Sequence, residues 1–178
     1  AVPLLGGAIA GGLASFAFLN FVELGRTEGL GPSREIGGLV GVLYALTGLS
    51  VLIGALSPSV GAKFLNVEDA DELREQRRML TYSSLAMLLL GGALVLLAIS
   101  GEGAFVLAQI GAIGSIAMIV GSTFLSVAMR RHTDELQRAL SSDATTTAFY
   151  LLLLFGGGWS ILAHLDFLAG PAPLDWLP

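Results

Sequence analysis

Five long apolar runs, separated by short polar connections, constrain the fold of this chain more than any other feature. About 20 apolar residues in a helix cross a hydrocarbon core of about 30 Å, and a backbone in lipid must satisfy its own hydrogen bonds. We therefore expect an all-α polytopic integral membrane protein, a bundle of five transmembrane helices that forms a single domain over residues 1–178. The predicted spans are residues 3–24, 36–56, 79–100, 104–129 and 145–168.

The composition supports a chain that lies in lipid. Hydrophobic residues make up 54% of the sequence, charged residues make up 13%, and the mean hydropathy is +0.78. Soluble domains carry about 25% charged residues, so this chain has too few to cover its own surface in water. The bilayer is therefore its first predicted partner. No basic segment precedes the first run and no small-residue cleavage site follows it, so we interpret it as a span rather than a signal peptide.

Two charged segments, which we call collar one (Asp71–Arg78) and collar two (Arg130–Arg138), each lead into an apolar run. We expect collar one to form one or two helical turns that continue into span three. Similar residues follow both collars in the same order, which favours an internal repeat of the parallel kind. The alternative is a chance match, because leucine runs are common in membrane proteins. The matching positions are Ser83 and Ser84 with Thr146 and Thr147, Leu88–Leu90 with Leu151–Leu153, and Gly91–Gly92 with Gly156–Gly158.

The basic residues predict the orientation of the chain, because short loops rich in Lys and Arg stay in the cytoplasm. Most of these residues lie in the two collars, whereas the turn after span three and the C-terminal tail contain none. We expect an inner (plasma) membrane protein with both collars in the cytoplasm and the C-terminus outside. Trp159 and Trp176 would then lie near the outer interface, where indole rings are enriched.

Glycines at a spacing of four residues predict close helix packing in the first two spans. Gly7 and Gly11 form one such pair, and Gly37 and Gly41 form another. Small residues at this spacing let two helix backbones approach closely in lipid.

Polar residues inside or near the spans are the candidates for function, because ionisable groups are costly in lipid. His164 has two interpretations: it could ligate a haem- or chlorophyll-type metal, or it could lie among the lipid headgroups near the end of span five. The sequence does not identify a cofactor. The other candidates, each of which also fits interfacial or helix-bonding roles, are Asn20, Glu23, Gln109 and Asp166.

Several classes of function are disfavoured. The chain has no cysteine, so it has no thiolate metal site. Its net charge of −5 argues against nucleic acid as a partner. It contains no metalloprotease, phosphate-loop or serine-hydrolase motif and no paired carboxylates within the spans, so we do not expect an enzyme.

The collars are also candidate docking surfaces for a membrane or cytoplasmic protein. The residues that would dock are Asp71, Glu72, Arg74, Arg77, Arg78, Asp134, Glu135 and Arg138. Among them, Asp71, Glu72 and Arg77, and in the second copy Asp134, Glu135 and Arg138, resemble a segment of small bacterial multi-span membrane proteins, Asp-Glu-x-x-x-x-Arg before a transmembrane hairpin. Some of those proteins look like membrane partners of DNA-binding regulators. The resemblance implies a bacterial membrane and a regulatory role, and it supplies no catalytic residue.

Three hypotheses for function follow. The leading one is a non-catalytic membrane protein that acts through protein contacts, as a regulatory partner or an accessory subunit of a larger assembly. The second is a transporter or channel for ions or small solutes, whose polar cavity would have to be built from Tyr44, Thr47, Ser50, Gln109 and Ser115. The third is a haem- or pigment-binding subunit that uses His164.

Overall fold

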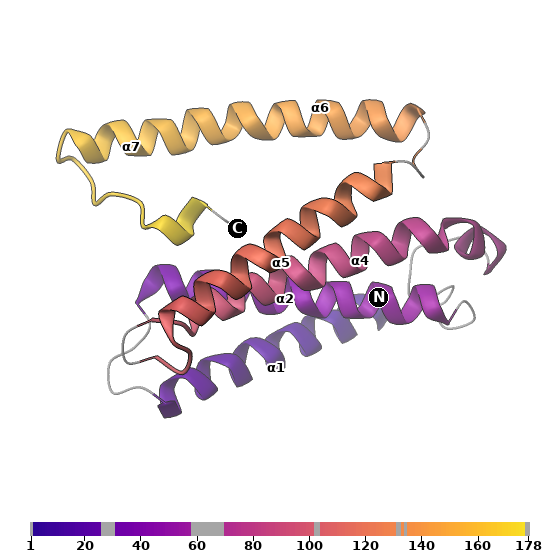
Figure 1. The fold of residues 1–178 in the computed structure, drawn as a ribbon, viewed down its shortest axis with the longest axis horizontal. Coiled ribbons are helices and arrows are strands. Elements are labelled where there is room, and N and C mark those ends of the chain that lie inside the picture. The colour runs from indigo at the N-terminus through magenta and orange to yellow at the C-terminus, as the bar shows by residue number, and fades with distance from the viewer. Residues whose placement is uncertain are drawn as a thin grey trace.

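The computed structural model describes residues 2–25, 31–57, 70–101, 104–130, 133 and 135–176, and in this part of the chain the regular structure is helical apart from one isolated bridge. Figure 1 shows the arrangement of the helices. The α-helices are α1 (Val2–Gly25), α2 (Pro32–Leu56), α4 (Ala70–Ala98), α5 (Ala108–Met129), α6 (Glu135–Leu151) and α7 (Gly157–His164). A π-helical segment, η2 (Leu152–Gly156), joins α6 to α7, and a short 3-10 helix, η3 (Pro173–Trp176), follows.

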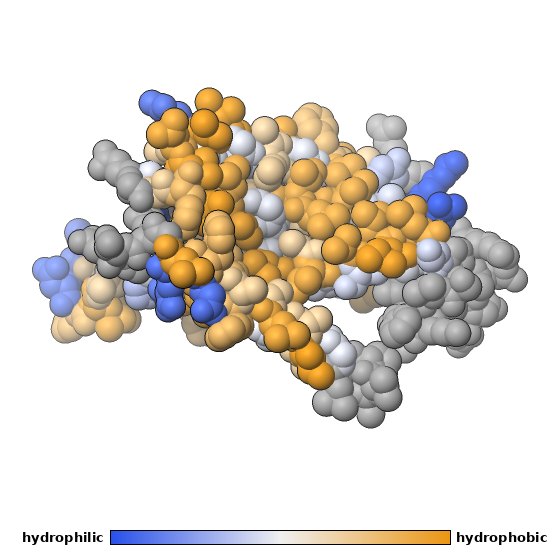
Figure 2. Space-filling model, turned by 90° about the horizontal axis from the view of Figure 1, so that it is seen from below, coloured by the Kyte–Doolittle hydropathy of each residue, from blue (hydrophilic) through white to orange (hydrophobic). Residues whose placement is uncertain are grey.

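The predicted all-α class is confirmed, and five helical segments are long and apolar enough to cross a membrane. Their surfaces are apolar as well: Leu24, Phe16 and Ile113 are 89%, 67% and 72% exposed. Figure 2 shows that apolar side chains cover much of the visible face of the molecule. Soluble monomers rarely expose apolar patches of more than a few hundred Å². These properties fit a multi-pass membrane protein.

Helices α2 and α4 form the centre of the bundle, with α1 against α2 and α5 against α4 (Figure 1). Glycine permits the close approach of α2 and α4. A Cβ atom added to Gly41 would lie 2.7 Å from the carbonyl oxygen of Gly91, and one added to Gly48 would lie 2.8 Å from that of Ser84. Any larger residue at these positions would push the two backbones apart.

Serine hydroxyls join α4 to α5. Ser115 Oγ donates to the carbonyl oxygen of Ala93 (3.2 Å), and Ser122 Oγ donates to that of Ala86 (3.0 Å). Both serines are buried. Side chains that bond across helices in this way hold membrane bundles together, because lipid offers the hydroxyl no competing partner.

The connection from α4 to α5 is longer than the sequence predicts. Span four was expected from residue 104, but α5 begins at Ala108. The preceding segment is held by backbone bonds instead: the amide of Val106 donates to Ile99 O (3.2 Å), and that of Gly101 donates to Val106 O (3.1 Å). Gly101 adopts a φ of 141°, a value that side-chain-bearing residues rarely take. Because of this small bridge, α5 begins at Ala108 rather than at residue 104.

The other helix boundaries also differ from the predicted spans. Helix α2 begins at Pro32, a residue suited to the first helical position, and not at residue 36. Helix α4 begins at Ala70, before the predicted span, and this confirms that collar one continues into the third apolar run as one helix. The last helix begins at Glu135, ten residues before the predicted span, and ends at His164. Polar residues in both collars are compatible with a helix, so the helices extend beyond the apolar runs.

Helices α6 and α7, with η2 between them, form one long rod (Figure 1). Every described side chain of α6 is exposed, unlike those of the central helices. Hydrogen bonds hold the rod near its ends. At one end, Arg138 Nη2 of α6 donates to Arg130 O at the end of α5 (2.9 Å). At the other end, Trp159 Nε1 of α7 donates to Ala169 O in the C-terminal segment (2.8 Å), and Ser33 Oγ of α2 donates to Asp175 Oδ1 in the same segment (2.6 Å).

The proposed internal repeat remains a prediction. Both collars open a helix that continues into an apolar run, at Ala70 in one copy and at Glu135 in the other. The environments differ, because α4 is central and α6 is exposed. The glycine clusters of the two copies do not lie at the same distance from their collars. This difference in spacing coincides with η2, the π-helical segment that follows α6.

Candidate functional site

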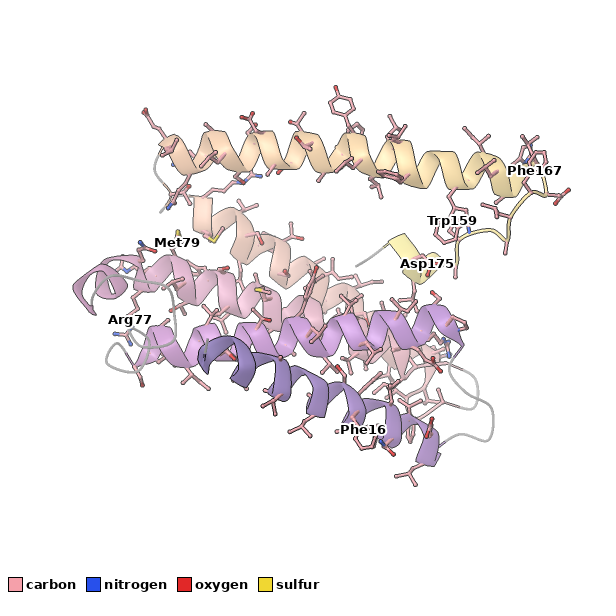
Figure 3. All side chains as sticks on the ribbon, turned by 180° about the vertical axis from the view of Figure 1, so that it is seen from behind. Phe16, Arg77, Met79, Trp159, Phe167 and Asp175 are labelled. Atoms are coloured by element: carbon pink, nitrogen blue, oxygen red, sulfur yellow. The ribbon has the colours of Figure 1, made fainter. Side chains whose placement is uncertain are left out.

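The two collars lie at the same end of the molecule. Met79, which directly follows collar one, and Arg138 of collar two line the same cavity. Figure 3 shows Arg77 and Met79 at one end and Trp159, Phe167 and Asp175 at the other.

The predicted docking residues are described in part. Arg77, Arg78, Glu135 and Arg138 are exposed. Asp71, Glu72 and Arg74 lie in the first turns of α4, but their side chains are outside the described part of the structure, as is the whole of Asp134.

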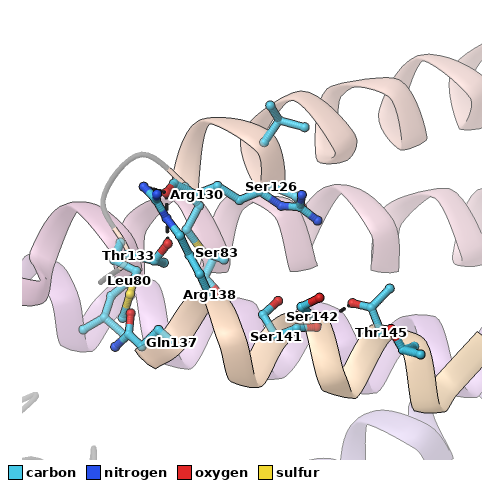
Figure 4. Close-up of a pocket in the computed structure, with 14 residues that line it drawn as sticks. Leu80, Ser83, Ser126, Arg130, Thr133, Gln137, Arg138, Ser141, Ser142 and Thr145 are labelled. Carbon is cyan, nitrogen blue, oxygen red and sulfur yellow. Dashed lines mark hydrogen bonds between the residues drawn. The ribbon is translucent and has the colours of Figure 1, made fainter. Parts of the chain in front are cut away.

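A cavity of about 900 Å³ opens between the start of α4, the end of α5 and the first half of α6 (Figure 4). Its lining combines two arginines, several hydroxyl groups and an apolar wall. The arginines are Arg130 and Arg138; the hydroxyl residues are Ser83, Ser126, Thr133, Ser141, Ser142, Thr145 and Thr146; the apolar residues are Met79, Leu80, Val127 and Met129, and Gln137 completes the lining.

Helical periodicity brings the α6 residues to this cavity. Gln137, Ser141 and Thr145 recur every four residues, and each has a lining neighbour at the next position. Residues three to four apart share one face of a helix. Leu140 and Asp143 do not line the cavity, and at about 100° per residue they fall on the side of α6 opposite the centre of the lining face.

The Arg130 carbonyl oxygen joins α5 to α6. It accepts hydrogen bonds from Arg138 Nη2 (2.9 Å) and from Thr133 Oγ1 (2.9 Å), as Figure 4 shows. The last carbonyl groups of a helix have no partner within it, and basic side chains there also interact favourably with the helix dipole. Arg138 therefore orients the start of α6 as well as lining the cavity.

His164 is the last residue of α7 and is exposed. Asp166 lies in the turn that follows, with a φ of 60°. Within the described ranges, no group of three or more His, Asp and Glu residues is arranged to hold a metal ion.

The remaining polar candidates do not converge on one site. Asn20 Nδ2 donates to Phe16 O in its own helix (2.9 Å), and Glu23 is exposed. Gln109 lies, exposed, in the first turn of α5.

The residues expected to build a transport cavity are also separated. Thr47 Oγ1 donates to Leu43 O (2.8 Å) and Ser50 Oγ to Leu46 O (2.8 Å), while Ser115 is buried between α4 and α5. None of these three, nor Tyr44 or Gln109, lines the 900 Å³ cavity or a smaller one of about 360 Å³ near Ser33 and Arg34.

The glycines within the helices include two distinct groups, which we call filled and open. A filled glycine faces a neighbour so close that an added Cβ would meet it within 3.0 Å; Gly38, Gly41, Gly48, Gly91, Gly111 and Gly114, on α2, α4 and α5, are filled. An open glycine has no such neighbour within 4 Å; Gly6, Gly7 and Gly12 on α1, and Gly157 and Gly158 on α7, are open. Of the other predicted packing residues, Gly11 lies 3.4 Å from Leu43 and Gly37 lies 3.9 Å from Leu174 by the same measure.

Sequence reasoning did not find the cavity. The signal available was the run of hydroxyl residues from Ser141 to Thr147, of which only Thr146 and Thr147 entered the repeat. The α6 hydroxyl residues line the same cavity as Ser83 and Ser126 because the chain turns back at Arg130.

Comparison of the chain with protein-family models, curated proteins and solved structures found no match.

Proposed function

We propose that this chain is a non-catalytic multi-pass membrane protein that acts through contact with another membrane protein, as a regulatory partner or accessory subunit. The observation that carries this proposal is the division of the glycines. Six glycines of α2, α4 and α5 are filled by neighbours in the chain, whereas Gly6, Gly7 and Gly12 of α1 and both glycines of α7 are open.

Open glycines need an explanation, because glycine weakens a helix by about 0.5–1 kcal/mol relative to alanine. At Gly41 and Gly91 this cost is offset by backbone contact between α2 and α4. At Gly157 and Gly158 the chain supplies no such contact. Small residues are the usual meeting points of helices in lipid, so a helix from another protein would restore the contact there.

The surroundings of Gly157 and Gly158 suit an apolar transmembrane helix as the partner. Leu154, Phe155 and Ile161, on the same rod, are 67%, 71% and 63% exposed. Large apolar side chains beside small ones give the ridges and recesses into which a second helix packs. The collars, at one end of the molecule, would add polar contacts on the cytoplasmic side.

The test is copurification of the affinity-tagged full chain from its native membrane in a mild detergent. The proposal expects a stoichiometric membrane-protein partner that also forms a cross-link to a photoreactive residue placed at Ile161. Replacing both Gly157 and Gly158 with Leu should abolish the cross-link and the copurification, because the added side chains fill the recess. The conservative substitution Leu162→Ile, on the same rod, should leave both intact.

The thermal midpoint of each purified variant separates loss of a partner from loss of the fold. The open glycines face no neighbour in the chain, so the double variant should melt within a few degrees of the parent protein. A chain that purifies alone, or a partner retained equally by the double variant, would contradict the proposal. An optical spectrum of the same preparation tests the haem or pigment hypothesis for His164.

A further inference from the structure

We infer that the cavity between α4, α5 and α6 is a binding site for the headgroup of an anionic phospholipid. The inference rests on the lining of this cavity and does not depend on the protein partner proposed above. Its volume of about 900 Å³ lies within the usual range of ligand pockets.

The charge of the cavity selects an anion. Arg130 and Arg138 both line it, and none of the described lining residues is acidic, although the chain as a whole has a net charge of −5. A guanidinium group carries five N–H donors, and the bond from Arg138 to Arg130 O uses one of them. Phosphate is the anion that such planar donors bind well, through charge-assisted hydrogen bonds.

Hydroxyl groups from three helices complement the arginines. Ser83, Ser142 and Thr146 donate no hydrogen bond elsewhere in the part of the chain that the structure describes, so their protons are available to phosphate oxygens. The hydroxyls of Ser126 and Thr145 already donate to carbonyl groups of their own helices, at 2.9 and 2.7 Å. Their lone pairs are acceptors for hydroxyl groups of a headgroup such as glycerol.

The apolar wall distinguishes a lipid from a free phosphate ion. Met79, Leu80 and Val127 line the cavity beside the polar groups. Further along the two helices that flank it, Phe124 of α5 and Phe149 of α6 are 72% and 60% exposed. Acyl chains that leave a headgroup held by the arginines would lie against these side chains.

The position of the cavity fits the same ligand. It lies at the collar end of the molecule, where the basic residues predict the cytoplasmic interface. Anionic lipids give the cytoplasmic leaflet its negative surface potential, and basic pockets between transmembrane helices bind their headgroups.

The test measures lipid retained by the purified full chain, using native mass spectrometry after titration with phosphatidylglycerol or phosphatidylcholine. We expect retention of phosphatidylglycerol over phosphatidylcholine. Arg130→Gln should reduce phosphatidylglycerol retention about tenfold, the effect of losing one charge-assisted hydrogen bond. Arg77→Gln removes the same charge from collar one, outside the cavity, and should change retention less than about twofold.

A second pair of variants keeps both arginines. Ser142→Glu places a carboxylate in the cavity and should abolish retention, whereas Leu140→Glu places it on the other side of α6 and should have little effect. Equal retention of the two lipids, or equal effects within either pair, would overturn the inference. Full displacement of the lipid by millimolar inorganic phosphate would assign the site to free phosphate instead and would also overturn it.

Discussion

The hydroxyl group of Ser33, in the first turn of α2, donates a 2.6 Å hydrogen bond to the carboxylate of Asp175, near the end of the described chain. The other oxygen of the same carboxylate accepts a 2.7 Å bond from the amide of Ala172. A negative charge at the N-terminus of a helix interacts favourably with its dipole. The bond therefore fastens the C-terminal segment to the bundle, at the end opposite the collars.

Loss of this fastening should release the C-terminal segment. Asp175→Ala removes both bonds, but only the bond from Ser33 joins the segment to α2. Cleavage by chymotrypsin near Phe167 should therefore accelerate about two- to tenfold, the effect of one hydrogen bond on local opening. Asp166→Asn removes a charge from the neighbouring turn and keeps a residue that tolerates its positive φ, so cleavage should be unchanged. Equal rates for Asp175→Ala and the parent protein would show that the bond does not hold the segment.

The contact between Gly41 and Gly91 should tolerate no side chain. A Cβ at Gly41 would lie 2.7 Å from the carbonyl oxygen of Gly91 and 2.9 Å from Leu94 Cβ. Gly41→Ala should therefore lower the free energy of unfolding by about 1–3 kcal/mol, the usual cost of overpacking. Gly12→Ala, at an open glycine of α1, should leave it unchanged or slightly raised. Unfolding in mixed micelles with increasing SDS measures both, and equal stability of the two variants would refute the predicted contact.

The serines between α4 and α5 should contribute measurably to stability. Ser115→Ala and Ser122→Ala each remove one bond between helices, at a cost of about 0.6–1.7 kcal/mol in membrane proteins. Ser126→Ala removes a hydroxyl whose hydrogen bond, to Ser122 O, lies within α5, and it serves as the control. In the same unfolding assay, the control should remain near the parent value while the other two fall below it.

The orientation of the chain can be tested directly, because it has no native cysteine. Glu135→Cys places a thiol at the collar end, and Phe167→Cys places one at the opposite end, both at exposed positions. In intact cells, a membrane-impermeant maleimide should label Phe167→Cys alone, and permeabilised cells should allow labelling of both. Labelling of Glu135→Cys in intact cells would reverse the proposed orientation.

Hydropathy predicts most of this fold, because each apolar run must become a helix in lipid. The helical class and the continuity of collar one with the third run were predicted, and the structure confirms both. The late start of α5 was not predicted, because it depends on backbone bonds between Ile99, Gly101 and Val106. The early start of α6 was missed as well, because residues 135–144 are too polar for an apolar window although they form a helix.

The candidate site was harder to predict than the fold. Arg138 was identified from sequence as a docking residue, and its bond to Arg130 O depends on the turn between two helices. Ser83 and Ser142 are far apart in sequence and line the same cavity only because the chain turns back between α5 and α6. Periodicity shows which residues share a helix face, but it does not show which helix that face will meet.

The polar first half of α6 also has a consequence for the membrane itself. It leaves the rod an apolar stretch from Ala148 to Ala163, about 24 Å long at 1.5 Å per residue. The hydrocarbon core of an average bilayer is about 30 Å thick. A span shorter than its bilayer is accommodated by local thinning or by flanking residues that extend towards the interfaces. In the proposed membrane topology, this hydrophobic mismatch should favour membranes built from shorter acyl chains.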